Sequence, residues 1–480
     1  MNMVRNGSRP EETALFPCLF PVLALLFVIT LIAGCAAAAR ESRQRQAKGY
    51  QEALTRLTQK NLSRSQCLEL KDCIQIALQN NLKGQAAEIQ ARIRKLEKNI
   101  AFANFLPSLE IKADYTAWEH QPKIKLGADV YEAMQDKEIR QTVVQAQIPI
   151  FVPAAWYLYS AYGRGAEIGD LVLDYTRQMI ALQVTAMFYH CLILENAEKA
   201  LQSQVKAAEA LQKEFDLFQE EGLVSDWQAG QVQTLVLARR LALNHTQRAR
   251  RQAKAELSGA MGLSPMADIS LVGEAPLSVP DNKLEDLVLQ ALLNNPQLHI
   301  ADRTVELQKD KIKMALSNFL PSLIGIAAFT DTSNSFVLDQ KYWMGGFAGV
   351  FSVFNGFSSV NEYKAARAQK KEALVQREEL CLSIMLEVIK ASLNLQDVEE
   401  QRQLAQKSLD VASMHLNQIE AQWQEGLIKP SERLNAVMEM DQAQMEVMNN
   451  RFQHQVSTAT LLNILGKTYM DNTDSKGEKK

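Results

Sequence analysis

The sequence predicts a mainly α-helical fold with a small transmembrane β part, in which a unit of helix, two strands and a long helical hairpin occurs twice. Three observations predict it. The hexapeptide at 104–109 recurs letter for letter at 318–323, an offset of 214 residues. Each copy is followed by segments that alternate apolar and polar residues, and then by a helical pattern too long for a globular core. A duplication of this length indicates one structural unit used twice with pseudo-symmetry.

The N-terminus resembles a bacterial secretion signal. Arg5 and Arg9 precede an apolar run that ends in Ile-Ala-Gly-Cys at 32–35, and small residues before a cleavage site are typical of signal peptides. Because this ending resembles a lipobox, residues 1–34 are predicted to be a lipoprotein signal peptide, with Cys35 as the lipidated first residue. An ordinary signal peptide or a membrane anchor is the alternative.

The residue after this cysteine indicates in which membrane the lipoprotein would reside. Ala36 stands where lipoproteins held at the inner membrane carry Asp, which favours the outer membrane. Residues 35–65 are charged and rich in Gln, with little apolar pattern, and are expected to form an extended or loosely helical lead-in.

The first repeat is predicted to span 66–263. Apolar residues recur every three or four positions from Leu70, which predicts a helix to Asn104 that ends before Pro107. Strict alternation then predicts strands at about 107–120 and 139–151, joined by a polar loop. In the first of these strands the apolar positions alternate with three charged ones, Glu110, Lys112 and Asp114, as expected for a strand with one polar face.

A long helical hairpin follows the strands. Residues 155–220 contain no proline, and a helix of that length spans about 100 Å, so it is expected to lie in a coiled coil or helical barrel. Gly222 suits the left-handed position after a helix and Ser225 can cap the next one. The hairpin tip is therefore predicted near 222.

The second repeat is predicted at 284–468, after a proline-containing linker at 264–283. Its strands are expected at about 321–331 and 341–354, and its hairpin tip near 426. Residues 469–480 are polar and are expected to be a disordered tail.

Four strands cannot close a transmembrane barrel, since about eight is the smallest bacterial number. The chain is therefore expected to contribute its strands to a shared barrel in an oligomer. A small soluble sheet is the alternative, because the barrel signal of each single strand is weak.

No site for chemistry is predicted. The six histidines are scattered, and no phosphate-binding loop or nucleophile elbow occurs, so no enzyme activity, cofactor or metal site is expected. The net charge of −3 gives no reason to expect a nucleic-acid partner. Met438, Met440, Met445 and Met448 cluster near the C-terminus and allow either core packing or a soft-metal site. Cys67 and Cys73 are either free or paired.

The ordered motifs together resemble the TolC-like outer membrane efflux protein family. Each half begins with an Ala-Leu…Asn-Asn element, at 77–81 and 291–296, followed by a Leu-Pro-Ser-Leu element, at 106–109 and 320–323. Each half then has a Gly-Leu hairpin tip, at 222–223 and 426–427, and a closing glycine, at 262 and 466. The resemblance implies a homotrimer, with a periplasmic α-barrel continued by a shared outer-membrane β-barrel.

The same resemblance implies a lipid-anchored exit duct of a tripartite efflux or type I secretion system. A periplasmic adaptor and an inner-membrane pump would be its partners, and the adaptor would dock at Gly222, Leu223, Gly426 and Leu427. An acidic periplasmic gate falls on Glu432, with Asn435 in place of a second acid. The alternative is a periplasmic coiled-coil structural or adaptor lipoprotein without a channel. The exported substrate is not predicted.

Overall fold

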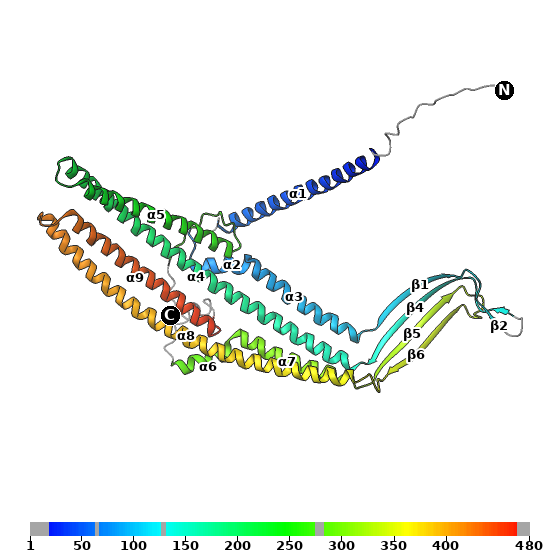
Figure 1. The fold of residues 1–480 in the computed structure, drawn as a ribbon. Helices are drawn as coiled ribbons and strands as arrows, with labels where there is room; N and C mark the ends of the chain where they lie inside the picture. Colours follow the sequence, from blue (N-terminus) through cyan, green and yellow to red (C-terminus); the bar gives the residue numbers. More distant parts are fainter. Residues whose placement is uncertain (1–18, 63–66, 126–130, 274–282, 468–480) are drawn as a thin grey trace, which may run out of the picture. The chain divides into compact units, whose positions relative to one another are not determined.

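The computed structural model describes residues 19–62, 67–125, 131–273 and 283–467, with side chains from residue 41 onward except that of Pro430 (Figure 1). The chain divides into two compact units, Met1–Gln66 and Cys67–Lys480. In the first unit, α1 (Leu19–Leu62) is one continuous helix. The segment predicted to be an extended or loosely helical lead-in is therefore a regular helix up to Leu62. Its content of Ala, Gln, Glu and Arg favours a helix.

The second unit contains two copies of one element order, to which the first copy adds a 3₁₀ turn and a pair of short strands. The first copy comprises α2 (Leu70–Asn80), α3 (Leu82–Phe102), a 3₁₀ turn (Ala103–Phe105), β1 (Ser108–Ala117), β2 (Lys123–Lys125), β3 (Tyr131–Ala133), β4 (Glu138–Phe151), α4 (Pro153–Glu220) and α5 (Asp226–Ala260). The second comprises α6 (Leu284–Asn294), α7 (Pro296–Ser317), β5 (Ser322–Thr332), β6 (Lys341–Val350), α8 (Ser358–Gln424) and α9 (Pro430–Ile464).

The sequence offsets carry over to the elements. The bounds of α2 and α6 differ by 214 residues, and those of α5 and α9 by 204. Strands β1 and β6 lie within the ranges expected from alternation, whereas β4 begins one residue before its range and β5 ends one residue after its range. Both hairpin turns fall at the expected glycines.

Two local predictions are wrong. The single helix expected from Leu70 to Asn104 is broken at Asn81, whose extended backbone ends α2 and whose side chain caps α3. The segment expected to be a loop between the first strands holds a small antiparallel pair, β2 and β3. Asparagine competes for backbone hydrogen bonds and so favours helix ends over helix interiors.

The four longer strands form one antiparallel sheet in the order β1-β4-β5-β6 (Figure 1). The central pair, β4 and β5, joins the two repeats. Strands β1 and β6 lie at the two edges. The sheet therefore ends on each side with a strand that has an unpaired edge in the described chain.

The register gives this sheet one apolar face and one polar face. Neighbours across the four strands follow rows, because paired residues in a sheet point to the same side. One row on the apolar face is Ile111, Val144, Phe329 and Trp343, and the next is Leu109, Ala146, Ala327 and Gly345. The opposite face carries the polar residues Glu110, Lys112, Asp114, Gln145, Gln147 and Thr330. Apolar residues share this face on the other strands, among them Val143, Ile326, Ala328 and Met344.

This apolar face has a polar border. At the end distant from the helices, Asp331 and Lys341 form an ion pair of 2.9 Å across β5 and β6. The four strands have 10 to 14 residues, and a membrane-spanning strand needs about 9–11. Both features fit a sheet that faces lipid on one side.

The long helices pair within each repeat, α4 with α5 and α8 with α9. Helix α4 has 68 residues and α8 has 67, so each spans about 100 Å. Among the described residues, α4 is long and apolar enough to pass a test for membrane-spanning helices. Its buried residues instead pack against other helices of the unit, and they include Val184, Phe188 and Tyr189.

Candidate functional site

The two hairpin tips have the same backbone construction. Gly222 and Gly426 have φ angles of 73° and 70°, in the left-handed region that glycine adopts without strain. The amide of Leu223 donates to the carbonyl oxygen of Phe218 at 2.8 Å, and that of Leu427 donates to Gln422 at 3.0 Å. These bonds close each helix with a Schellman-type turn.

The turns present their leucines to solvent. Leu223 is 67% exposed and Leu427 is 74% exposed. After the first turn, Ser225 and Gln228 form a capping box that starts α5. Each tip is thus a rigid turn with an apolar side chain at its end, a form suited to contact with another protein.

Sequence reasoning missed a difference between the tips. Trp227, in the first turn of α5, is 70% exposed, and Leu217 before the turn is exposed as well. The 204-residue offset puts Ser431 and Ala421 at the corresponding places of the second tip. The first tip therefore offers a larger apolar surface. The sequence signal for this difference was a tryptophan among polar residues at the predicted start of the return helix, Trp227.

The proposed gate residues lie on the first turns of α9. Glu432 and Asn435 are both exposed and are three positions apart, so they share a helix face. The neighbouring Arg433 is held elsewhere: its guanidinium pairs with Glu420 at 3.0 Å and lies 5.4 Å from the Trp423 ring centroid. Among the described residues Glu432 has no ion-pair partner, so its carboxylate is exposed without a neutralising base.

A groove of about 390 Å³ lies above the tips, where α4 faces α8 and α9. Its lining includes Lys206, Glu214, Trp423 and Arg433. Burial raises the pKa of the Glu214 carboxyl above its usual value. Beside it, Leu211, Val232 and Leu434 form a small core from α4, α5 and α9, against which Met438 packs. This packing favours the core interpretation of Met438 over a metal ligand.

The closing motifs of each repeat meet in space. Asn81 caps α3 and its amide donates to the carbonyl oxygen of Ala260 at 2.7 Å. Asn295 caps α7 and donates to Ile464 at 3.1 Å. These equivalent bonds tie the start of each repeat to the end of its own return helix.

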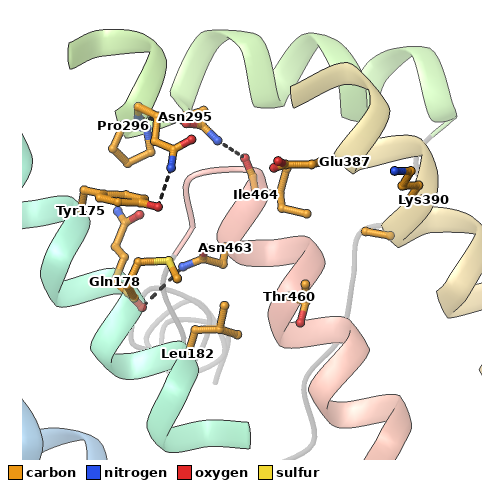
Figure 2. A pocket seen from close by; sticks show the side chains of 13 residues that line it. Tyr175, Gln178, Leu182, Asn295, Pro296, Glu387, Lys390, Thr460, Asn463 and Ile464 are labelled. Atoms are coloured by element: carbon orange, nitrogen blue, oxygen red, sulfur yellow. Dashed lines mark hydrogen bonds between the residues drawn. The ribbon is translucent and has the colours of Figure 1, made fainter. Parts of the chain in front are cut away.

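A second cavity, of about 460 Å³, lies where α4 of the first repeat meets α7, α8 and α9 of the second (Figure 2). Tyr175 and Gln297 are hydrogen-bonded across it. The amide of Asn463 donates to the carbonyl oxygen of Gln178 at 3.4 Å. These contacts fix the two repeats to each other.

The remaining candidates fall at the N-terminus or do not cluster. Cys35 lies within α1, and its side chain is outside the described residues, as is the whole of the 469–480 tail. Cys67 and Cys73 are free, with Cys67 exposed and Cys73 buried. Within the described ranges, no three His, Cys, Asp or Glu side chains gather as a metal site would require.

A sequence profile for outer membrane efflux proteins matches residues 287–467, which is nearly all of the second repeat. Over these residues the second repeat resembles the outer membrane efflux protein family. No curated protein matches the sequence significantly.

Solved structures of membrane channels extend the likeness in fold to most of the chain. The Campylobacter jejuni CmeC outer membrane channel is 16% identical, with a TM-score of 0.72 over 85% of this chain and 88% of its own. The Neisseria gonorrhoeae MtrE outer membrane channel is 16% identical, with a TM-score of 0.69 over 84% and 90%. CusC is 15% identical, with a TM-score of 0.70 over 84% and 94%.

These structures confirm the predicted fold class. The chain has the TolC-like fold, mainly helical with a small β part, and the recognition of the efflux family from ordered motifs is correct. The profile falls on the repeat whose Asn295, Gly426 and Gly466 occupy motif positions described above.

Proposed function

We propose that this chain is the outer-membrane exit duct of a tripartite efflux or type I secretion system. The observation that carries the proposal is the four-stranded sheet with one apolar face and two free edges, continuous with hairpins about 100 Å long. The apolar face would meet lipid, and the face with Glu110, Lys112 and Asp114 would line a wet lumen. A periplasmic coiled-coil protein without a channel would have no use for such a sheet.

Closure requires further copies of the chain. A homotrimer would supply twelve strands to one barrel, above the minimum of about eight. The long helices would continue the barrel as a tunnel across the periplasm. Transport through this duct would be passive, with the energy supplied by the inner-membrane pump.

A periplasmic adaptor, joined to an inner-membrane pump, is the proposed partner at the tips. Leu223, Leu427 and Trp227 present apolar surface there. Glu432 would place an acidic ring near the periplasmic mouth, and acidic rings favour cations. Replacement of Glu432 by Gln should lower the preference of the pore for K⁺ over Cl⁻, and an unchanged preference would refute the gate assignment.

Lipidation at Cys35 would add an anchor in the outer membrane, while most of the helical part stays in the periplasm. A diacylglyceryl cysteine carries at least two acyl chains, which suffice for stable anchoring. The lipid and the shared barrel would therefore be two separate anchors, and only the barrel would persist when the cysteine is removed.

This difference provides the test. A form that begins at Ala36, placed behind a cleavable non-lipoprotein signal, should still fractionate with outer membranes and require detergent for extraction. Release of this form into the aqueous fraction as a folded protein would contradict the duct and favour the coiled-coil lipoprotein.

A further inference from the structure

Two buried thiols of the first repeat belong to none of the sites described above. Cys73 on α2 is fully buried, and Cys191 on α4 is 1% exposed. Cys67, by contrast, is exposed, and Cys381 is partly exposed. A buried cysteine usually serves as a small apolar residue, so a further role requires evidence that the two thiols lie together.

Helices α3 and α4 run antiparallel, and two contacts between them give their register (Figure 1). Lys95 pairs with Asp170 at 2.8 Å. A Cβ added to Gly84 would lie 3.2 Å from the side chain of Ile180. From the first contact to the second, the chain moves back eleven positions on α3 and forward ten on α4.

A further step of the same size leads to the two thiols. Cys73 precedes Gly84 by eleven positions, and Cys191 follows Ile180 by eleven. Eleven residues are about three helical turns, so Cys191 lies on the face of α4 that Ile180 turns toward α3. Helix α2 itself packs against α4, so the contact continues past the break at Asn81, and Cys73 lies on the buried face of α2. The register therefore places the two thiols opposite each other.

The electrostatics of Cys73 agree with this placement. Burial is the main cause that raises the pKa of its thiol to about 12, and the charges of Asp72 and Cys191 contribute to the increase. A like charge shifts the pKa of a neighbouring group over a distance of a few ångströms. Cys191 is therefore part of the immediate surroundings of Cys73.

The second repeat has two leucines at the equivalent positions. The offsets of 214 and 204 residues lead from Cys73 to Leu287 on α6 and from Cys191 to Leu395 on α8. Leu287 belongs to a buried apolar cluster, and Leu395 packs against that cluster. Two positions that meet in one core of the second repeat are thus both cysteine in the first.

We propose that Cys73 and Cys191 form a disulfide bond in the exported protein, which ties α2 covalently to α4. The signal at 1–34 would take the chain out of the reducing cytosol, where such bonds are rare. The structure describes the chain before this step, with both thiols free. The inference requires export alone and does not depend on the proposed duct.

The bond forms by thiol–disulfide exchange with a disulfide-bearing oxidant. The two thiols lose two protons and two electrons, the new S–S bond replaces that of the oxidant, and the oxidant leaves as a dithiol. Exchange requires a thiolate, which burial disfavours at both positions once the core has formed. The bond therefore forms while the chain folds, and burial then protects it from reduction.

Thiol trapping tests the bond directly. In the folded protein both sulfurs are shielded whether or not they are bonded, so detergent-extracted protein is unfolded in guanidinium with N-ethylmaleimide and no reductant, and then digested for mass mapping. We expect the Cys73 peptide linked to the Cys191 peptide, label on Cys67 and Cys381, and separation of the linked peptides on reduction. Label on Cys73 and Cys191 without reduction, or a link from Cys73 to Cys67, would overturn the proposal.

The leucine pair of the second repeat supplies a matched control. Leu287→Cys and Leu395→Cys are introduced together in a chain that carries Cys73→Ala and Cys191→Ala. A bond between positions 287 and 395 in this variant would show that the cells oxidise thiols placed at this point of the repeat. Free thiols at 73 and 191 in the natural chain, prepared in the same way, would then refute the pairing itself.

Unfolding provides a second measurement. The bond would close a loop of about 120 residues, and a cross-link over such a span stabilises a folded protein. Reduction should therefore lower the denaturant midpoint of the natural chain in detergent, and should leave unchanged that of the variant that combines Cys73→Ala with Cys191→Ala. Cys67→Ser should respond to the reductant like the natural chain. An equal response of the natural chain and the double variant would contradict the bond.

Discussion

Two glycines have a structural role that their sequence context alone does not reveal. Gly262 and Gly466 have φ angles of 71° and 74°, and an added Cβ would lie 2.3 Å from the carbonyl oxygen of Asn80 or Asn294. At the tips, a Cβ on Gly222 would meet nothing within 4 Å. The first two glycines are required by backbone angle and by contact, whereas the tip glycines are required by angle alone.

Gly262→Ala should therefore destabilise the fold by about 3 kcal/mol or more, since left-handed strain and overpacking add. Gly222→Ala should cost about 1 kcal/mol. Denaturant unfolding in detergent measures both changes. Equal losses in the two variants would contradict the close contact between Gly262 and Asn80.

The buried thiols give a second prediction at this scale. Burial raises the pKa of the Cys73 thiol to about 12, and burial likewise raises that of Cys191 to about 12. The thiolate is the reactive form, so at pH 8 both should react with an alkylating reagent roughly 100-fold or more slowly than exposed Cys67. Mass mapping of time-resolved alkylation checks this, and equal rates in the folded protein would refute the burial of Cys73 and Cys191.

At the scale of elements, the second hairpin contains an ion pair that is lost at acid pH. Glu399 on α8 bonds with Arg402, and His454 on α9 lies 3.8 Å away. The bond from Arg402, more than any other contact, lowers the pKa of the Glu399 carboxyl to about 2. Because the folded pKa lies below the ordinary value, the stabilisation is present above about pH 4.5 and is lost as pH falls toward 2.

Glu399→Gln should therefore flatten the decline in stability between pH 5 and pH 3 relative to the unmodified chain. Thermal unfolding across this range measures the effect. An unchanged pH profile would show that Glu399 does not couple to folding.

The tips allow a functional prediction. Asp in place of both Leu223 and Leu427 should abolish export while the oligomer persists, because the apolar ends of the turns would become charged. Leu338→Asp, at a fully exposed loop position between β5 and β6, is the matched control and should leave export intact. Normal export by the double tip variant, measured beside oligomer recovery, would refute docking at these turns.

The elements also show which parts of this fold can be predicted from one sequence. The longer strands were predictable from alternation, and the hairpins from a long stretch without proline followed by a glycine, because signals such as Gly222 and Pro107 act locally on the backbone. The helix break at Asn81 was missed because helical spacing continues across it, and only contact with Ala260 distant in the sequence reveals its role. The small β2–β3 pair was missed because three-residue strands are too short for alternation to register.

At the candidate site, the turn residues were predictable and their surroundings were not. Gly222 and Gly426 could be predicted because glycine adopts the left-handed backbone conformation after a helix without strain. The exposure of Trp227 and the cavity between α4 and the second repeat arise from packing of distant segments. Cys35 remains a prediction from the lipobox.

At the scale of the whole molecule, the second unit is an incomplete structure. Its sheet has two free edges, formed by β1 and β6. Exposed apolar side chains also run in a stripe along α8 and in another along α3. Each feature is costly for a monomer in water, since open edges and apolar stripes promote association. A ring of copies would satisfy the strand edges and cover the stripes together.

The most direct measurement is the conductance of detergent-extracted protein in planar bilayers, made on a fraction whose oligomeric mass has been determined. We expect a trimer that forms discrete, stable channels. A water-soluble monomer without conductance would contradict the shared barrel, and with it the central claim that this chain is an outer-membrane duct.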